Sequence, residues 1–314
     1  MIAGRTVPVP VFFPSVSSVK ANGRPSEYVR LLTAAGEPHF LVSAYDVAAG
    51  DNTEQAAMQE ALSVATTRGA SVLLDSGNYE SFWKADSSWT PGHLATVLAS
   101  TSAQVAFCYD NQRPPSDARA SADEIVAAID REQAAAPNTT VCPIVHGTPE
   151  QLVAVVRSTA ERLQPLVLAV AERELGDGIL ARARTVRRLR ATLDEVARAT
   201  NLHVLGTGSP IAILVYAMAG AQSFDGLEWC HTCVDPDTAR LHHFQHRDLV
   251  RTLEPSITSG LAYGPGTLLH NLFFFRTWLT RIRDALASGT AATLLGSVLP
   301  TSRRDEVIAA LRNP

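Results

Sequence analysis

The sequence predicts an α/β fold of the (β/α)8 TIM-barrel type, in which eight parallel strands alternate with helices and close into a ring. Short runs rich in β-branched and aromatic residues alternate along the chain with longer Ala-, Arg- and Glu-rich stretches. The short runs are apolar almost throughout, as strands are when helices cover both faces of a parallel sheet. There are eight such runs, the number that closes a barrel. An open, doubly wound sheet is the alternative fold.

The predicted strands are short and are bounded by turn residues. They are residues 9–15, 39–46, 71–77, 104–110, 140–147, 166–172, 202–208 and 222–228. The predicted helices lie between them, and several begin with a capping residue or a first-turn proline. They are residues 52–69, 118–136, 149–164, 178–200 and 209–221.

The segment after the eighth strand has a different character. Residues 229–265 are rich in His, Thr, Pro and Gly without periodicity, which predicts a loop-rich insertion. Residues 267–289 have amphipathic spacing and predict a helix that closes the barrel. Because no linker separates two regions of different composition, we expect one domain over residues 1–314.

The composition limits the function classes. With 46% hydrophobic and 18% charged residues, the chain can form a large core, which excludes disorder and coiled coil. The net charge of −4 excludes a uniformly basic surface for nucleic acid, so any such contact must be local. No apolar run approaches the roughly 18 residues of a membrane span, and the first residues lack a signal-peptide pattern. We therefore expect a soluble, cytoplasmic protein without membrane partners.

Polar residues follow or end most of the predicted strands. In barrels of this type, active sites lie at the C-terminal ends of the strands. Each residue taken singly is an ordinary loop-start or helix-capping residue. Six at equivalent positions indicate a site: Asp46, Asp75, Asp110, His146, Glu172 and Asp225.

Seven segments, taken in order, resemble the tRNA-guanine transglycosylase superfamily, whose members exchange guanine for a 7-deazaguanine base. They are PVFFPSV (10–16), LLDSGNYES (73–81), AFCYDNQRPP (106–115), PIVHG (143–147), HVLGTGSP (203–210), QSFDGLEW (222–229) and LLHNLFFF (268–275). The second resembles the D-S-G-G-aromatic segment of that superfamily and the third its F-D-E-x-x-P segment. Each motif alone is weak, and the collinear set is more specific.

Two features differ from the tRNA-acting members. Between Asp225 and His270 the chain lacks the C-x-C-x-x-C cluster that, with the helix histidine, holds a structural zinc in those enzymes. Residues 228–244 stand where the superfamily has a P-T-R-type tRNA-contacting stretch, without an arginine at the matching place. The chain is therefore more similar to the DNA-guanine transglycosylase branch, which modifies DNA.

The resemblance implies a pentosyltransferase with two catalytic carboxylates. Asp225 would be the nucleophile that forms a covalent glycosyl-enzyme intermediate at C1′, and Asp75 the general acid and base. Strands three and eight of a barrel deliver their ends to the same mouth, so the two can meet despite their distance in sequence. We expect guanine in a nucleic acid to be replaced by a 7-deazaguanine such as preQ0 or preQ1.

The same resemblance implies the base-binding residues. Asp110 would accept hydrogen bonds from N1–H and the exocyclic amine of a guanine-type base, and Tyr79 would stack on the ring. His146 stands where a glutamine is expected, which predicts an altered base preference. The alternative for Tyr79 is an ordinary half-buried loop tyrosine, and the alternative for His146 is a histidine that caps the end of its strand. The other predicted substrate-binding residues are Ser76, Gly77, Gly147, Leu205 and Gly206.

No cofactor is predicted. Cys230, Cys233 and His270 could together bind a structural zinc ion. The alternative is that His270 is a core residue or lies at the start of the closing helix. Cys108 and Cys142 lie in apolar runs and are expected to be core thiols. For Glu172 a solvated ion pair with Arg173 is expected rather than a pocket role.

The partners follow from the predicted reaction: a guanine or 7-deazaguanine base, and a nucleic acid, with DNA favoured over tRNA. A second copy of the chain, in a homodimer, is a further candidate partner. The alternatives are a tRNA-guanine transglycosylase, an enzyme of free nucleosides or nucleotides, and a non-catalytic paralogous subunit. Five arginines on loops after strands four and eight could hold a phosphate backbone: Arg113, Arg119, Arg240, Arg247 and Arg251.

Overall fold

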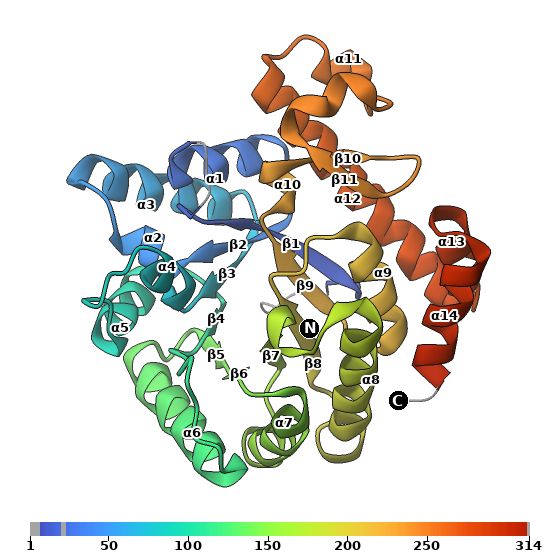
Figure 1. Ribbon diagram of the computed structural model, residues 1–314. Coiled ribbons are helices and arrows are strands. Elements are labelled where there is room, and N and C mark those ends of the chain that lie inside the picture. The colour runs from blue at the N-terminus through green and yellow to red at the C-terminus, as the bar shows by residue number, and fades with distance from the viewer. Residues whose placement is uncertain (1–6, 20–22, 313–314) are drawn as a thin grey trace.

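The chain folds into a parallel sheet curled into a nearly closed barrel with helices around it (Figure 1). The computed structural model describes residues 7–19 and 23–312. The strands are β1 (Val11–Val16), β2 (His39–Ser43), β3 (Ser71–Asp75), β4 (Val105–Phe107), β5 (Thr140–Cys142), β6 (Ile144–Val145), β7 (Val167–Ala171), β8 (Asn201–Leu205) and β9 (Ser223–Gly226). They are ordered β5-β4-β3-β2-β1-β9-β8-β7-β6.

Strands form in all eight predicted runs. Neighbouring strands pair in parallel, β1 pairs with β9, and β5 and β6 are the two ends of the strand order. This order is that of a barrel, so the doubly wound alternative is wrong. The predicted strand count was also wrong: the barrel has nine strands because the run 140–147 is divided at Pro143. Proline has no N–H to give to a neighbouring strand. The Pro143 carbonyl still accepts a hydrogen bond from Ala169 N at 2.9 Å, which joins this segment to β7.

Alternation along the strands divides the core into two layers. Inside the barrel, Phe13 of β1 lies in one apolar cluster with Leu73 and Phe107. The preceding residue, Phe12, faces outward and stacks on Phe275 with 4.3 Å between the ring centroids. The outer cluster fills the space between strands and helices and is the larger of the two.

The helices surround the barrel (Figure 1). They are α1 (Pro25–Ala34), α2 (Ala44–Ala48), α3 (Asn52–Thr67), α4 (Asn78–Trp83), α5 (Pro91–Ser100), α6 (Ala118–Ala135), α7 (Pro149–Leu163), α8 (Gly178–Val196) and α9 (Pro210–Ala219). The five predicted helices are confirmed as α3, α6, α7, α8 and α9. Their capping signals are real: Asp51, Thr148 and Ser209 each accept a hydrogen bond from the first turn of the following helix.

The predicted loop-rich insertion is ordered into short elements, so that prediction was wrong in part. It contains α10 (Glu228–His231), an antiparallel hairpin of β10 (Thr232–Asp235) and β11 (Arg240–His243), η2 (Phe244–Leu249) and α11 (Pro255–Thr258). Elements this short give little periodicity in sequence. Asn271 of the next helix fixes the hairpin: its side chain accepts from Val234 N and donates to the Trp229 and Thr232 carbonyls.

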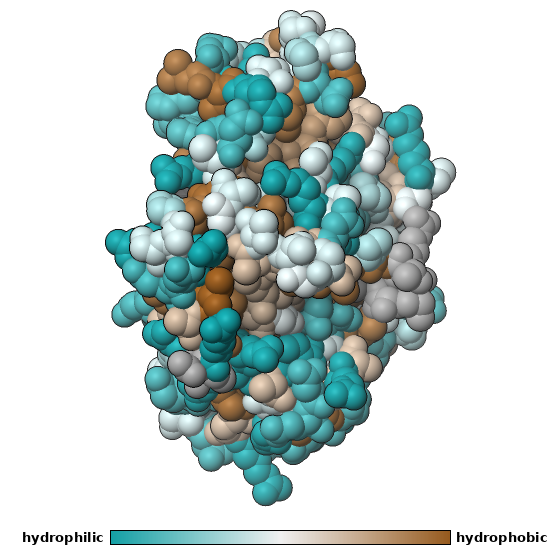
Figure 2. Space-filling view, turned by 90° about the vertical axis from the view of Figure 1, so that its right-hand side faces the viewer, coloured by the Kyte–Doolittle hydropathy of each residue, from teal (hydrophilic) through white to brown (hydrophobic). Residues whose placement is uncertain are grey.

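The insertion projects from the barrel as a lobe (Figure 1). Figure 2 shows apolar and hydrophilic surface side by side on this lobe. Three large apolar side chains of the lobe are exposed: Leu249, Ile257 and Leu261. The predicted closing helix is confirmed as α12 (Tyr263–Ala287). It is followed by α13 (Ala291–Val298) and α14 (Thr301–Arg312), which pack against α9 and α8. Among the described residues, no helix is both long and apolar enough to cross a membrane.

Candidate active site

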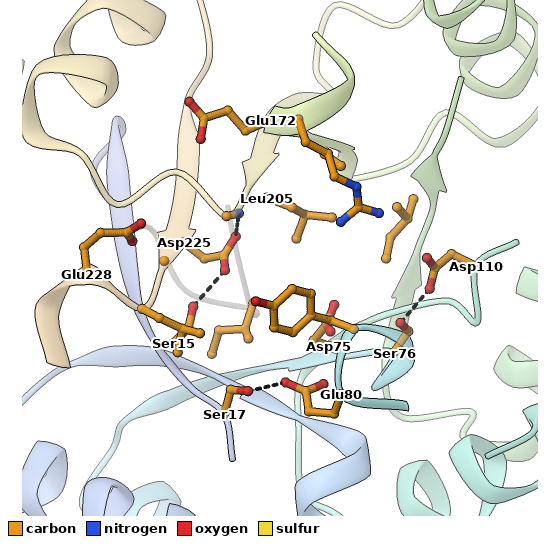
Figure 3. Close-up of a pocket in the computed structure, with 18 of the residues that line it drawn as sticks. Ser15, Ser17, Asp75, Ser76, Glu80, Asp110, Glu172, Leu205, Asp225 and Glu228 are labelled. Atoms are coloured by element: carbon orange, nitrogen blue, oxygen red, sulfur yellow. Dashed lines mark hydrogen bonds between the residues drawn. The ribbon is translucent and has the colours of Figure 1, made fainter. Parts of the chain in front are cut away.

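A cavity of about 460 Å3 opens at the C-terminal ends of the barrel strands (Figure 3). Eight of the ten predicted site residues line it: Asp75, Ser76, Tyr79, Asp110, His146, Leu205, Gly206 and Asp225. They come from the ends of five strands and the loops that follow, because parallel strands end at one rim of a barrel. Of the six strand-end residues, Asp46 does not line the cavity and instead binds Ser18.

The two remaining predicted residues, Gly77 and Gly147, support the site from outside the cavity lining. Gly77 precedes α4 with φ +84°, and a Cβ there would lie 2.6 Å from Tyr45 N, so only glycine fits. Gly147 N donates to Glu174 Oε2 at 3.1 Å. Gly147 also lines an adjoining hollow of about 510 Å3.

Asp225, the predicted nucleophile, lies at the end of β9 and is held by three donors. Ser15 Oγ donates to Oδ2 at 2.7 Å, and Gly206 N donates to Oδ1 at 2.9 Å. His203 Nε2 lies 3.1 Å from Oδ1. Ser15 and His203 lie on β1 and β8, the two strands that flank β9, so the barrel itself fixes the orientation of this carboxylate.

Asp75, the predicted general acid, lies at the end of β3 in a different environment. Burial raises its pKa well above the usual range, and the negative charges of Glu80, Asp110 and Asp225 raise it further. The hydrogen bond from Gly77 N, at 3.4 Å, opposes this rise weakly. Asp75 therefore keeps its proton to higher pH than an ordinary aspartic acid does.

Glu80 of α4 also lines the cavity and was not predicted. Its carboxylate accepts hydrogen bonds from Ser17 Oγ and Ser43 Oγ, each at 2.5 Å. Burial and the charge of Asp46 raise its pKa to about 7 despite these hydrogen bonds. It adds a second acidic group beside Asp75 that changes protonation state near neutral pH.

Asp110 and His146 form the opposite wall of the cavity and belong to one buried chain of hydrogen bonds. His146 Nε2 lies 2.7 Å from Asp110 Oδ2, and Nδ1 lies 2.7 Å from Glu174 Oε1. Burial lowers the pKa of His146, but hydrogen bonds and charge from the two carboxylates outweigh it and raise the pKa to about 9. His146 is thus an imidazolium at neutral pH, with both ring nitrogens donating.

The Asp110 carboxylate has a full set of hydrogen-bond donors. Oδ1 accepts from Ser76 Oγ at 2.6 Å and Asn78 Nδ2 at 2.9 Å, and Oδ2 accepts from His146 and from Gln112 Nε2. Burial raises the pKa of Asp110, but these donors outweigh it and lower the pKa below its usual value. An ionised carboxylate has about four acceptor positions, and all four are filled.

Glu172 lines the cavity from η1 (Glu172–Glu174), and its predicted partner is wrong. It pairs with Arg182 at 3.1 Å and accepts from Tyr216 Oη at 2.9 Å. Arg173 instead lies 3.7 Å from Glu174 and donates to Gln112 Oε1. Arg173 and Arg182 are the two arginines among the described residues that line the cavity.

Tyr79 lies on α4 and faces the cavity half-buried. Its ring contacts the exposed Trp83 edge-on, with 6.2 Å between the centroids. Burial and the nearby charge of Glu80 raise the pKa of the phenol, so it stays neutral. This arrangement is compatible with the predicted stacking role.

The candidate zinc ligands do not form a metal site. Within residues 7–19 and 23–312, no group of three or more His, Cys, Asp or Glu could hold a metal ion. His270 Nε2 donates to the Val234 carbonyl at 2.8 Å, and Nδ1 accepts from Leu253 N at 3.1 Å. Cys230 and Cys233 are buried, and so are the predicted core thiols Cys108 and Cys142.

The five arginines proposed for phosphate binding do not line the cavity. Arg247 lies over the ring of Tyr263 at 4.5 Å and donates to its carbonyl. Arg251 pairs with Asp237 at 2.9 Å, and Arg240 is exposed on β11. These three belong to the insertion lobe.

Comparison with models of known protein families found no match, and no curated protein matches the chain either. The likeness of the motifs to guanine transglycosylases therefore stays a prediction.

Some cavity residues were not predicted, because they do not end a strand. Glu80 and Gln112 lie in a helix and a loop. His203 does not line the cavity but contacts Asp225 from within the apolar strand β8, and it was not predicted either. A histidine near the start of the predicted strand 202–208, on the face that points into the barrel, was a usable signal for a buried polar network.

Proposed function

We propose that the protein is a base-exchange transglycosylase that replaces guanine in a nucleic acid with a 7-deazaguanine. The observation that carries the proposal is one cavity lined by two carboxyl groups in contrasting environments. Asp75 is favoured in its protonated form, and Asp225 is held by three donors. Such a difference between neighbouring carboxyl groups is typical of an acid paired with a nucleophile.

In this mechanism Asp225 attacks C1′ of the target nucleotide while Asp75 gives its proton to the departing base. The C–N glycosidic bond breaks as the Asp225–C1′ bond forms, which leaves a covalent glycosyl-enzyme. The incoming base then gives a proton to Asp75 and displaces Asp225. Ser15 and Gly206 hold the carboxylate ready for both steps.

The barrel is of the (β/α)8 type under this proposal, with β5 and β6 counted as one strand interrupted at Pro143. Cavity size supports a base-sized ligand, since pockets for small molecules begin at roughly 300 Å3. DNA is the favoured polymer because the tRNA-contacting stretch and the zinc cluster are replaced in the sequence.

Free nucleosides are the second candidate substrate, and a specific observation favours them. None of the five arginines proposed for the phosphate backbone lines the cavity. Arg240, Arg247 and Arg251 belong to the insertion lobe, and Arg113 and Arg119 are exposed on the loop after β4 and on α6. A nucleoside needs no such contacts.

Incubation with labelled guanine and, in parallel, duplex DNA, tRNA and guanosine tests the proposal. We expect labelled DNA and unlabelled tRNA. Label in guanosine alone would assign the nucleoside activity, label in tRNA alone would reverse the choice of polymer, and label in none of the three would refute base exchange.

A further inference from the structure

The Asp110 side of the cavity holds one protein group that differs from the others. Ser76, Asn78 and His146 are buried, but Gln112 is an exposed loop residue whose amide reaches into the site. Its Nε2 donates to Asp110 Oδ2, and its Oε1 accepts from Arg173. Both ends of one carboxamide are therefore bound by the cavity wall.

A carboxamide has the same N–C=O unit as the N1–C6–O6 edge of guanine. In both, an N–H donor lies beside a carbonyl acceptor. Asp110 and Arg173 thus offer an acceptor and a donor at the spacing of that unit. Adenine reverses the order and would place a lone pair against the carboxylate.

We propose that Gln112 occupies the place of the base edge in the empty enzyme, and that Arg173 binds the carbonyl oxygen of the base. This inference rests on the proposed function, because it names the edge by which the transferred base is read. On binding, Gln112 turns out and the base takes over its two hydrogen bonds. Exposed side chains reorient within nanoseconds, so this exchange meets no large barrier.

The geometry also indicates that the exocyclic amine of the base is not recognised by Asp110. When Gln112 leaves, it frees one acceptor position on Asp110 Oδ2, while Ser76 and Asn78 remain on Oδ1. That position suits N1–H. The exocyclic amine of guanine gains no acceptor from Asp110, so hypoxanthine is expected to bind within a few-fold of guanine. This narrows the role of Asp110 from two base donors to one.

Equilibrium dialysis with three labelled free bases tests the inference without any sugar transfer. Guanine and hypoxanthine carry the N–H and C=O edge, and 2-aminopurine lacks it. We expect Arg173→Met to weaken binding of guanine and hypoxanthine roughly tenfold or more, as loss of a hydrogen bond to a charged donor does, and to leave 2-aminopurine unchanged. Arg173→Lys should restore part of the loss. Arg187→Met, at an exposed α8 position outside the cavity lining, is the control.

Gln112→Ala supplies the second test, because removing a competing group raises the apparent affinity. We expect this variant to bind guanine several-fold more tightly than the wild type. A purely structural role for Gln112 predicts equal or weaker binding. Equal affinity of the wild type for all three bases, or an unchanged Arg173→Met variant, would overturn the inference.

The two proposals can fail separately. If DNA is labelled but free-base binding ignores Arg173 and Gln112, the exchange stands and the edge assignment is wrong. If the binding pattern is found without label in any acceptor, the cavity binds lactam bases and does not exchange them. No binding by the wild type or by Gln112→Ala would refute the edge assignment directly.

Discussion

His146 lies between two carboxylates, and this arrangement predicts how stability depends on pH. Its Nε2 and Nδ1 are each 2.7 Å from a carboxylate oxygen, and its pKa is raised from 6.5 to about 9 in the folded protein. Below pH 6.5 the ring is protonated in both folded and unfolded chains, so its contribution is complete. As the pH rises toward 9, only the folded state keeps the proton, and the contribution is lost.

The expected magnitude follows from the rise in pKa. Each pKa unit corresponds to about 1.4 kcal/mol, so the rise to about 9 is worth about 3 kcal/mol of unfolding free energy. His146→Gln removes the titrating ring. The stability of the wild type relative to this variant should therefore fall by about 3 kcal/mol between about pH 6 and about pH 9.5.

Urea unfolding at a series of pH values measures this difference. His243→Gln, which changes an exposed histidine on β11 and keeps His146, is the control, and its stability should fall with pH as that of the wild type does. Titration of the His146 ring by NMR in the wild type gives a second measurement that needs no variant. If the difference in unfolding free energy between the wild type and His146→Gln does not change up to about pH 9.5, the ion-pair reasoning is refuted.

Three further predictions concern binding and catalysis. Asp110→Asn should weaken guanine binding by about 1–3 kcal/mol in dialysis, since an amide can place a donor against N1–H, and unchanged affinity would exclude Asp110 from the pocket. The rate of exchange should fall as the pH rises through the raised pKa of Asp75. Glu80→Gln should move this fall in rate to lower pH, because it removes a negative charge that raises the pKa of Asp75. Identical pH–rate profiles for the wild type and Glu80→Gln would contradict the assignment of Asp75 as proton donor. Arg240→Glu should weaken retention of every DNA sequence alike in filter binding at low salt, whereas equal retention would show that this exposed arginine meets no phosphate.

Much of the fold could be predicted because each strand and long helix carries its own local pattern. The capping residues Asp51 and Thr148 mark helix starts that the structure contains. The division at Pro143 was not predicted, although a proline inside a strand run is a signal for interrupted pairing. The hairpin of the insertion depends on contacts with Asn271, which lies far from it in sequence.

The candidate site was predictable to the extent that strand ends converge. Asp75, Asp110 and Asp225 share a cavity because each ends or follows a parallel strand. The Gln112–Arg173 contact joins a loop to the short helix η1, and no periodic pattern in the sequence predicts contacts between such segments. For the same reason the partner of Glu172 was wrongly predicted.

The central claim is that Asp225 becomes covalently bound to C1′ of the substrate sugar. Intact-protein mass spectrometry of enzyme mixed with duplex DNA and denatured before the second displacement tests it most directly, with Asp225→Asn as the variant. Asp237→Asn, at an exposed position in the insertion lobe, serves as control. We predict an adduct that maps to Asp225, persists in Asp237→Asn and is absent from a folded Asp225→Asn protein. An adduct retained in Asp225→Asn, or one that maps to Asp75, would contradict the account.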